Sequence, residues 1–174
     1  MKAGLLNLIL STDVQYTDNN ALAAGIIFST WDSEIPTRTV VKKIDKIEPY
    51  QPGQFYKREL PCLLALLTEV IEPLEAIIID GYVTLGQERR PGLGMHLYES
   101  IDATIPIVGV AKKAFTETPE NYKILRGNSL NPLYVSSIGI PTSEAKALVA
   151  KMHGKHRIPT MLKKADQLCR GIAV

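Results

Sequence analysis

Two apolar runs in this sequence end in an aspartate, and a glutamate lies between the two runs. Asp13 follows the run 8–10, Asp80 follows the run 76–79, and Glu59 lies in the segment 56–61. The charge of an acid at the tip of a buried strand lies beside low-dielectric core, so it must be paired, protonated or bound to a metal. Three converging carboxylates suit a hard, oxygen-ligated cation such as Mg²⁺. Bound in this way, Mg²⁺ or Mn²⁺ orients a water nucleophile and neutralises phosphate during phosphodiester hydrolysis.

A simpler explanation exists for each acid taken alone. An aspartate at a strand end is often a turn former, and an acid near a helix start is stabilised by the helix dipole. The metal interpretation depends on all three acids meeting at one point, so the elements that carry them must be neighbours.

The periodicity of apolar residues predicts an α/β fold with one mixed sheet. Strands are expected at 8–16, 21–29, 38–47, 76–80, 105–110 and 133–137, and helices at 54–70, 96–101, 142–152 and 159–169. Pro61 is expected to delay the first helix until near that residue, because proline is tolerated only in the first turn. Three antiparallel strands followed by β-α-β crossovers give a sheet with helices on both faces. In that order the strands that end in Asp13 and Asp80 are central neighbours and deliver both acids to one end of the sheet.

Length and composition limit the classes of protein. With 174 residues, of which 45% are hydrophobic and 22% charged, the chain is expected to form one soluble domain over residues 1–174. The net charge of +2 is too small to indicate a nucleic-acid partner by itself. Cys62 and Cys169 lack a metal-binding spacing and are expected to be core thiols in a reducing compartment. No apolar run reaches the roughly 20 residues of a membrane span, and residues 1–7 do not resemble a signal peptide, so a cytoplasmic protein without a membrane partner is expected.

Several short motifs, in order along the chain, resemble those of the endonuclease V family. They are Thr12-Asp13-Val14, Pro49-Tyr50-Gln51-Pro52-Gly53, Arg58-Glu59, Asp80-Gly81, Val108-Gly109-Val110-Ala111-Lys112 and Asn131-Pro132-Leu133, and they extend over about residues 8–170. The resemblance implies an RNase H-like fold. It also implies a metal-dependent endonuclease that recognises hypoxanthine, the base of inosine, in DNA or RNA. Such enzymes hydrolyse the second phosphodiester on the 3′ side of that base with Mg²⁺ or Mn²⁺.

The resemblance assigns the metal and catalytic roles to particular residues. Asp13, Glu59 and Asp80 correspond to the metal-binding acids, and Lys112 to the lysine that contacts the region of the scissile phosphate. Asp166 matches a late acid or histidine near the metals. The alternatives are that Lys112 is a solvated lysine at a strand end and that Asp166 is a solvated helix aspartate.

The resemblance also assigns the substrate-binding roles. Tyr50 corresponds to the wedge that fills the space of the displaced base, and Gly53, Gly81 and Gly92 to residues that line the base pocket through backbone groups. A tyrosine on a proline-stiffened loop can stack on bases with little loss of entropy. Glycine lets the backbone approach the edge of a flipped base, which a side chain would block. The alternative is that Tyr50 is an ordinary exposed loop aromatic.

The segment after Asp80, expected to be a loop over residues 81–94, departs most from the family pattern. Val83 takes the place of a second glycine, and Gly86 or Gln87 stands where a histidine close to the metal centre is expected. His96 matches another family position and is expected to be a packing residue. The alternative function is therefore a nucleic-acid-binding module of the same fold with weakened or altered catalysis. A third, remoter option is a nuclease that acts on junctions or flaps.

Three basic clusters, at 89–90, 112–113 and 151–157, offer phosphate contacts if they line one face, and are only solvated surface if they scatter. The sequence does not choose between DNA and RNA, because recognition of the 2′-hydroxyl leaves no short motif. It gives neither the number of metal ions nor the oligomeric state.

Overall fold

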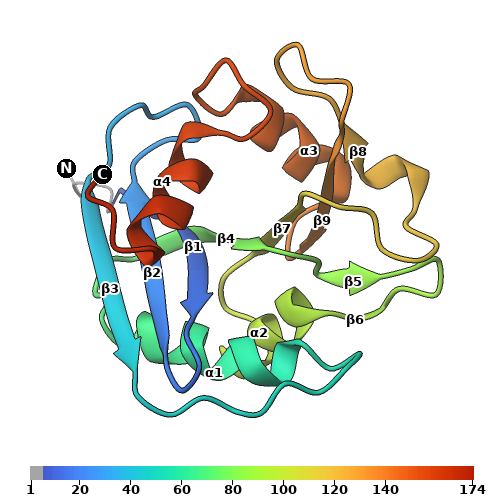
Figure 1. The fold of residues 1–174 in the computed structure, drawn as a ribbon. Helices are drawn as coiled ribbons and strands as arrows, with labels where there is room; N and C mark the ends of the chain where they lie inside the picture. Colours follow the sequence, from blue (N-terminus) through green and yellow to red (C-terminus); the bar gives the residue numbers. More distant parts are fainter. Residues whose placement is uncertain (1–5) are drawn as a thin grey trace.

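A seven-stranded mixed sheet with two helices on each face forms the protein in the computed structural model, which describes residues 6–174 (Figure 1). The strands of this sheet are β1 (Leu8–Tyr16), β2 (Ala21–Phe28), β3 (Arg38–Ile44), β4 (Leu74–Asp80), β7 (Ile107–Ala111), β8 (Lys123–Ile124) and β9 (Leu133–Ile138). Their order is β3-β2-β1-β4-β7-β9-β8. Strands β1, β4 and β7 are parallel, and the other pairings are antiparallel. A separate short hairpin consists of β5 (Thr84–Leu85) and β6 (Arg90–Pro91).

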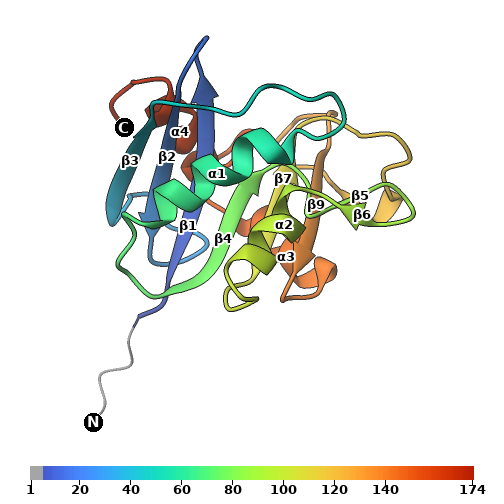
Figure 2. The same ribbon diagram turned by 90° about the horizontal axis from the view of Figure 1, so that it is seen from below.

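The helices lie in two layers that enclose the sheet (Figure 2). Helices α1 (Tyr56–Leu67) and α2 (Leu93–Ser100) cover one face, and α3 (Thr142–Lys151) and α4 (Thr160–Cys169) cover the other. Successive residues of β4 point to opposite faces, so Ile77 and Ile79 pack with α1 and α2 whereas Ile78 packs with α3 and α4. A central strand buried on both faces must be apolar throughout, which explains the unbroken run before Asp80. The α/β mixed sheet with helices on both faces is therefore confirmed.

The strand register places the two aspartates at the same end of the sheet. Ser11 of β1 pairs with Ile78 of β4, so Asp13 and Asp80 lie at the same level two residues further on. Asp80 in turn pairs with Val110 of β7, which leads directly to Lys112. Parallel strands thus bring three charged side chains to one end of the sheet, and for Asp13 and Asp80 this agrees with the prediction from the order of the elements.

The start of α1 differs from the prediction. The helix begins at Tyr56, so Pro61 lies inside it rather than in its first turn. Proline has no N–H to donate to the carbonyl group of Lys57, but Lys57 is exposed and water can satisfy that group. The proline therefore destabilises this helix less than it would destabilise a buried helix. Glu59 lies in the first turn of α1, before the proline.

Two stretches that gave no regular pattern contain short elements. Residues 81–94, predicted as a loop, hold the β5–β6 hairpin and the start of α2. Residues 116–130 hold a 3-10 turn, η1 (Glu120–Tyr122), followed by β8. Among residues 6–174 no helix combines the length and apolar character needed to cross a membrane. The expectation about a signal peptide involves residues 1–5, which lie outside the described residues.

Candidate active site

Four acids gather near the carboxyl ends of the central strands. Asp13 lies in β1 and Asp80 ends β4, whereas Glu59 lies in α1 on one face of the sheet and Asp166 in α4 on the other. Ligand atoms of Asp13, Asp166 and Cys169 all lie within 4.8 Å of one another. Asp13 and Asp80 also line one small cavity, the acid cavity, together with Thr12, Val110, Lys112 and Leu162. The convergence expected of the two aspartates is therefore present, although Asp13 lies within β1, three residues before its end, and only Asp80 ends its strand.

Asp80 is paired with Lys112 and Asp166 with Arg170, but the fold leaves the charges of Glu59 and Asp13 poorly compensated. Glu59 is only 5% exposed, and burial raises its pKa well above the usual value, with Asp13 and Asp80 adding to the rise. Burial likewise raises the pKa of Asp13 to about 6; the charge of Asp80 adds to this shift and Lys112 opposes it. Asp13 accepts one hydrogen bond of 2.8 Å from the backbone N–H of Val14. Carboxylates crowded in this way are what a divalent cation relieves.

Lys112 supplies a cation that faces these acids. Its Nζ lies 2.8 Å from Oδ2 of Asp80. Burial alone would lower the pKa of Lys112, but attraction to Asp80 and to Asp13 raises it above the usual value. The side chain is therefore an ammonium group at neutral pH. It can stabilise negative charge at this point, but it is not a general base.

A second cavity, of about 340 Å³, opens beside Asp80 and brings together the four residues predicted to bind a base. Tyr50 and Gly53 come from the loop before α1, Gly81 follows β4, and Gly92 caps α2. The rest of this base cavity is mostly aromatic or apolar: Phe55, Tyr56, Asp80, Tyr82, Leu85, Pro91, Leu93 and Phe115. A cavity of this size with aromatic walls suits a planar heterocyclic ring.

Comparison with known proteins identifies the family. A family model described as Endonuclease V matches residues 1–167. The chain belongs to the endonuclease V family. Endonuclease V of Pyrococcus abyssi is 32% identical over 170 residues, which cover 96% of this chain and 81% of that protein. Endonuclease V of Thermococcus kodakarensis is 29% identical over 172 residues, which cover 98% of this chain and 82% of that protein.

Solved structures of endonuclease V share the fold. The structure of the Streptomyces avermitilis protein superimposes with a TM-score of 0.75 at 26% identity, over 96% of this chain and 81% of that chain. Endonuclease V of Ciona intestinalis, in complex with a 24mer DNA containing an inosine followed by a ribo-adenosine, matches with a TM-score of 0.73 at 18% identity, over 95% of this chain and 85% of that one. Because the family is one of endonucleases, the chain is an enzyme of the endonuclease class.

The donor atoms of this endonuclease V member fit a hard divalent cation. Burial raises the pKa of Cys169 to about 12, so its thiol is protonated in the metal-free protein. The carboxylate oxygens of Asp13 and Asp166 remain as donors. Asp80 and Glu59 belong to the same electrostatic cluster, since Asp80 and Asp13 both raise the pKa of Glu59.

The segment in which Val83 replaces a family glycine is firmly packed. Val83 is fully buried, and its N–H donates to Oγ of Ser136 at 2.9 Å. The N–H of Gly92 donates to the carbonyl group of Val83 at 2.9 Å. Gly92 therefore lines the base cavity, but its N–H is not available to donate a hydrogen bond to a base. A Cβ at Gly109 would lie 2.5 Å from the carbonyl oxygen of Gly81, which requires glycine in β7. Val83 is thus a core residue, and the altered segment holds Gly81 and Gly92 in place.

Some residues of the site gave no signal in the short motifs. Cys169 approaches Asp13 from α4, and only its spacing of three residues from Asp166 on one helix face could have shown it. Tyr56 forms a wall of the base cavity and stacks on His96 with ring centroids 3.8 Å apart. This contact agrees with the packing role expected of His96. Of the two residues at the expected position of the missing histidine, Gly86 is buried and Gln87 is exposed, and both lie in the turn of the hairpin.

Proposed function

We propose that this protein is a Mg²⁺-dependent endonuclease, for which Mn²⁺ substitutes, that hydrolyses a phosphodiester on the 3′ side of hypoxanthine in DNA or RNA. One observation carries the proposal: Asp80 lines both the acid cavity and the base cavity. A base held in one cavity therefore leaves its own backbone at the acids of the other. An enzyme that selects a base and cleaves the strand beside it needs its base-binding cavity next to its catalytic acids.

The base cavity supports the specificity. Its volume of about 340 Å³ lies at the lower end of the range of about 300–1,000 Å³ typical of small-ligand sites, which suits one extruded base. Tyr50 is 59% exposed on the loop between Pro49 and Pro52, where its ring can take the place of the extruded base in the stack. Hypoxanthine pairs weakly, so extruding it costs less than extruding a normal base. The Ciona relative, whose structure contains inosine DNA, supports this substrate class.

The four acids support the metal dependence. Asp13, Glu59, Asp80 and Asp166 would hold the cation through their carboxylate oxygens. When bound, Mg²⁺ supplies positive charge for the phosphate and activates water at neutral pH. Glu59 is too deeply buried to retain its negative charge without compensation. A bound cation would supply that compensation.

Lys112 acts on the phosphate as a fixed cation. Its ammonium group pairs with Asp80 at 2.8 Å and is held at the edge where the acid and base cavities meet. Negative charge that develops on a phosphate there gains stabilisation from an ammonium group already in position. Because its pKa is raised, Lys112 retains its proton during the reaction.

The alternative of a binding module without catalysis has less support. A chain that only binds has no use for buried, uncompensated acids, and here Glu59 and Asp13 both persist. The altered segment after Asp80 is packed against Ser136 and does not disrupt the cavity. We further propose that residues 1–174 act as one domain, since both helix layers share one sheet, and that the enzyme is cytoplasmic, in keeping with its free, buried cysteines.

A cleavage assay tests the proposal. Purified protein is mixed with 5′-labelled strands that contain one inosine or one adenosine at the same position, with Mg²⁺, Mn²⁺ or EDTA. We expect one product, cut on the 3′ side of inosine, with either metal and none with EDTA. Asp80→Asn abolishes the product, whereas Asp45→Asn, which changes a carboxylate that is 84% exposed, does not. Intact inosine strands with both metals would refute the specificity.

A further inference from the structure

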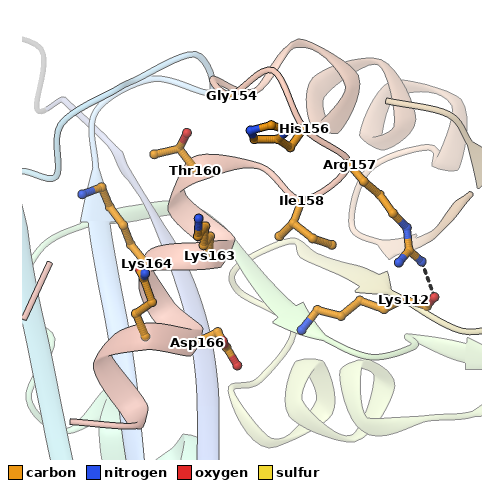
Figure 3. Close-up of a pocket in the computed structure, with 10 residues that line it drawn as sticks. Lys112, Gly154, His156, Arg157, Ile158, Thr160, Lys163, Lys164 and Asp166 are labelled. Atoms are coloured by element: carbon orange, nitrogen blue, oxygen red, sulfur yellow. Dashed lines mark hydrogen bonds between the residues drawn. The ribbon is translucent and has the colours of Figure 1, made fainter. Parts of the chain in front are cut away.

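A third cavity, of about 550 Å³, lies between α4, the loop 152–159 and Lys112. We call it the basic groove. Its cationic side chains are Lys112 and Arg157 on one side and Lys163 and Lys164 of α4 on the other, and Asp166 supplies the one carboxylate (Figure 3). Lys112 is paired with Asp80, but within residues 6–174 the other three cations form no ion pair, so this cavity is electropositive although the chain as a whole carries only +2.

A buried arginine fixes the outer wall of the basic groove. Arg126 is 6% exposed, and its guanidinium donates to the carbonyl groups of Met152, Gly154, His156 and Arg157 at 2.6–3.1 Å. One side chain therefore satisfies four carbonyl groups of a loop that has no regular structure. Such a loop keeps its shape before any ligand arrives, which lowers the entropy lost on binding.

Arg157 joins this wall to the active site. Its guanidinium donates to the carbonyl group of Lys112, and to that of Pro132 at 2.9 Å. The backbone that carries Lys112 is thus tied to the loop that forms the groove (Figure 3). The basic groove and the acid cavity are therefore joined at Lys112.

The lysines of α4 are available to an anion. Met161 and Ala165 are buried against the sheet, so Lys163 and Lys164 lie off the buried face of the helix. Within residues 6–174 neither lysine forms an ion pair, in contrast to Lys112, which pairs with Asp80. Two unpaired ammonium groups beside two further cations are the electrostatic footprint of a phosphate backbone.

The three cavities follow one another across the molecule. The base cavity and the acid cavity share Asp80, and the acid cavity and the basic groove share Lys112. We propose that the basic groove binds the sugar-phosphate backbone of the substrate strand on the 3′ side of the cleaved bond. This assignment rests on the proposed function, because only a base in the base cavity and a cut on its 3′ side fix the direction of the strand. In this orientation the nucleotides on the 3′ side of the cleaved bond lie along Lys163 and Lys164.

Binding measurements with strands of different arm length test the proposal. Fluorescence anisotropy in EDTA gives the Kd of single-stranded DNA with one inosine and either an eight-nucleotide 3′ arm or an eight-nucleotide 5′ arm. The double variant Lys163→Gln/Lys164→Gln is compared with Lys42→Gln/Lys43→Gln, which removes two adjacent lysines of the edge strand β3. Circular dichroism confirms that both variants are folded.

We expect Lys163→Gln/Lys164→Gln to weaken binding of the 3′-arm strand about tenfold at 0.1 M salt and to reduce the slope of log K against log salt by about 1.4, which is about 0.7 for each lost phosphate contact. Binding of the 5′-arm strand and both Kd values of the control variant should remain unchanged. Equal losses on both arms, or no loss, would overturn the proposal. The same measurements with adenosine strands separate this proposal from the proposed function. If wild-type protein binds inosine strands no better than adenosine strands, the proposed specificity fails. A smaller salt slope for Lys163→Gln/Lys164→Gln, but not for the control variant, would still support a backbone site in the groove.

Discussion

The most informative perturbation is Asp13→Asn, because it separates the cost of the acid cluster from its function. Asparagine retains an Oδ1 that accepts the hydrogen bond from Val14, so the substitution removes the charge and little else. In the metal-free protein we expect this variant to be more stable than wild type at pH 8. An enzyme that gains stability when it loses a residue of its site has kept that residue for function.

The magnitude follows from the pKa of Asp13, which burial and Asp80 raise from 3.8 to about 6. Folded protein therefore holds this proton to higher pH than unfolded protein, so the free energy of unfolding falls as the pH rises from about 4 to above 6. At about 1.4 kcal/mol per pKa unit the loss is about 3 kcal/mol. Since the asparagine amide is itself partly buried, we expect Asp13→Asn to recover about 1–3 kcal/mol at pH 8, or about 3–10 °C in Tm.

Thermal and urea unfolding at pH 4 and pH 8, with EDTA or with excess Mg²⁺, measures this effect. In EDTA the variant should exceed wild type at pH 8, and the two should agree at pH 4, where both residues are uncharged. With Mg²⁺ at pH 8 the difference should shrink or reverse, because only wild type gains stability from the bound cation. Asp45→Asn serves as the exposed control. If Asp13→Asn is no more stable than wild type at pH 8 in EDTA, the acids are not electrostatically strained and the reasoning is refuted.

Three further outcomes are expected. Lys112→Met should bind Mg²⁺ at least as tightly as wild type by calorimetry, since it removes the ammonium that competes for Asp80, yet lose cleavage; weaker binding would contradict this. Gly109→Ala should lower the free energy of unfolding by about 1–3 kcal/mol in urea, because its Cβ would lie 2.5 Å from the carbonyl oxygen of Gly81; a neutral effect would show that the segment yields. Tyr50→Ala should reduce the preference for inosine over adenosine strands in single-turnover cleavage while unfolding as wild type does, since its side chain is 59% exposed; an unchanged preference would remove it from base recognition.

Asp13 and Asp80 could be placed side by side from the sequence because their positions follow from the order of the elements. An apolar run that ends in an acid predicts a buried strand, and parallel neighbours bring such ends together. The position of Pro61 inside α1 could not be predicted in this way. Proline is expected to end or delay a helix because it removes one backbone hydrogen bond, and the free energy lost depends on whether water can replace that bond. At the exposed Lys57 this loss matters little, and exposure is a property of the folded chain.

The remaining walls of the base cavity and much of the basic groove could not be predicted, for a different reason. Tyr56, Tyr82 and Phe115 meet around the base cavity although they come from three separate segments. Arg126 lies in a stretch without a recognisable period, and its four carbonyl partners lie 26–31 residues away. Contacts of this kind depend on tertiary packing and leave no local spacing. Of the basic residues in 151–157, His156 and Arg157 line the basic groove with Lys112, and the structure adds Lys163 and Lys164 to them.

In the function proposed for this protein, the acids hold a catalytic metal beside a cavity that selects hypoxanthine. Single-turnover cleavage of matched inosine and adenosine strands, made as DNA and as RNA, tests it most directly when wild type and Asp13→Ala are compared with Mg²⁺ and with EDTA. We expect the wild-type protein to cut on the 3′ side of inosine in DNA, in RNA or in both, when Mg²⁺ is present and not in EDTA. Cleavage that ignores the base, or that survives in EDTA or in Asp13→Ala, would contradict the proposed function.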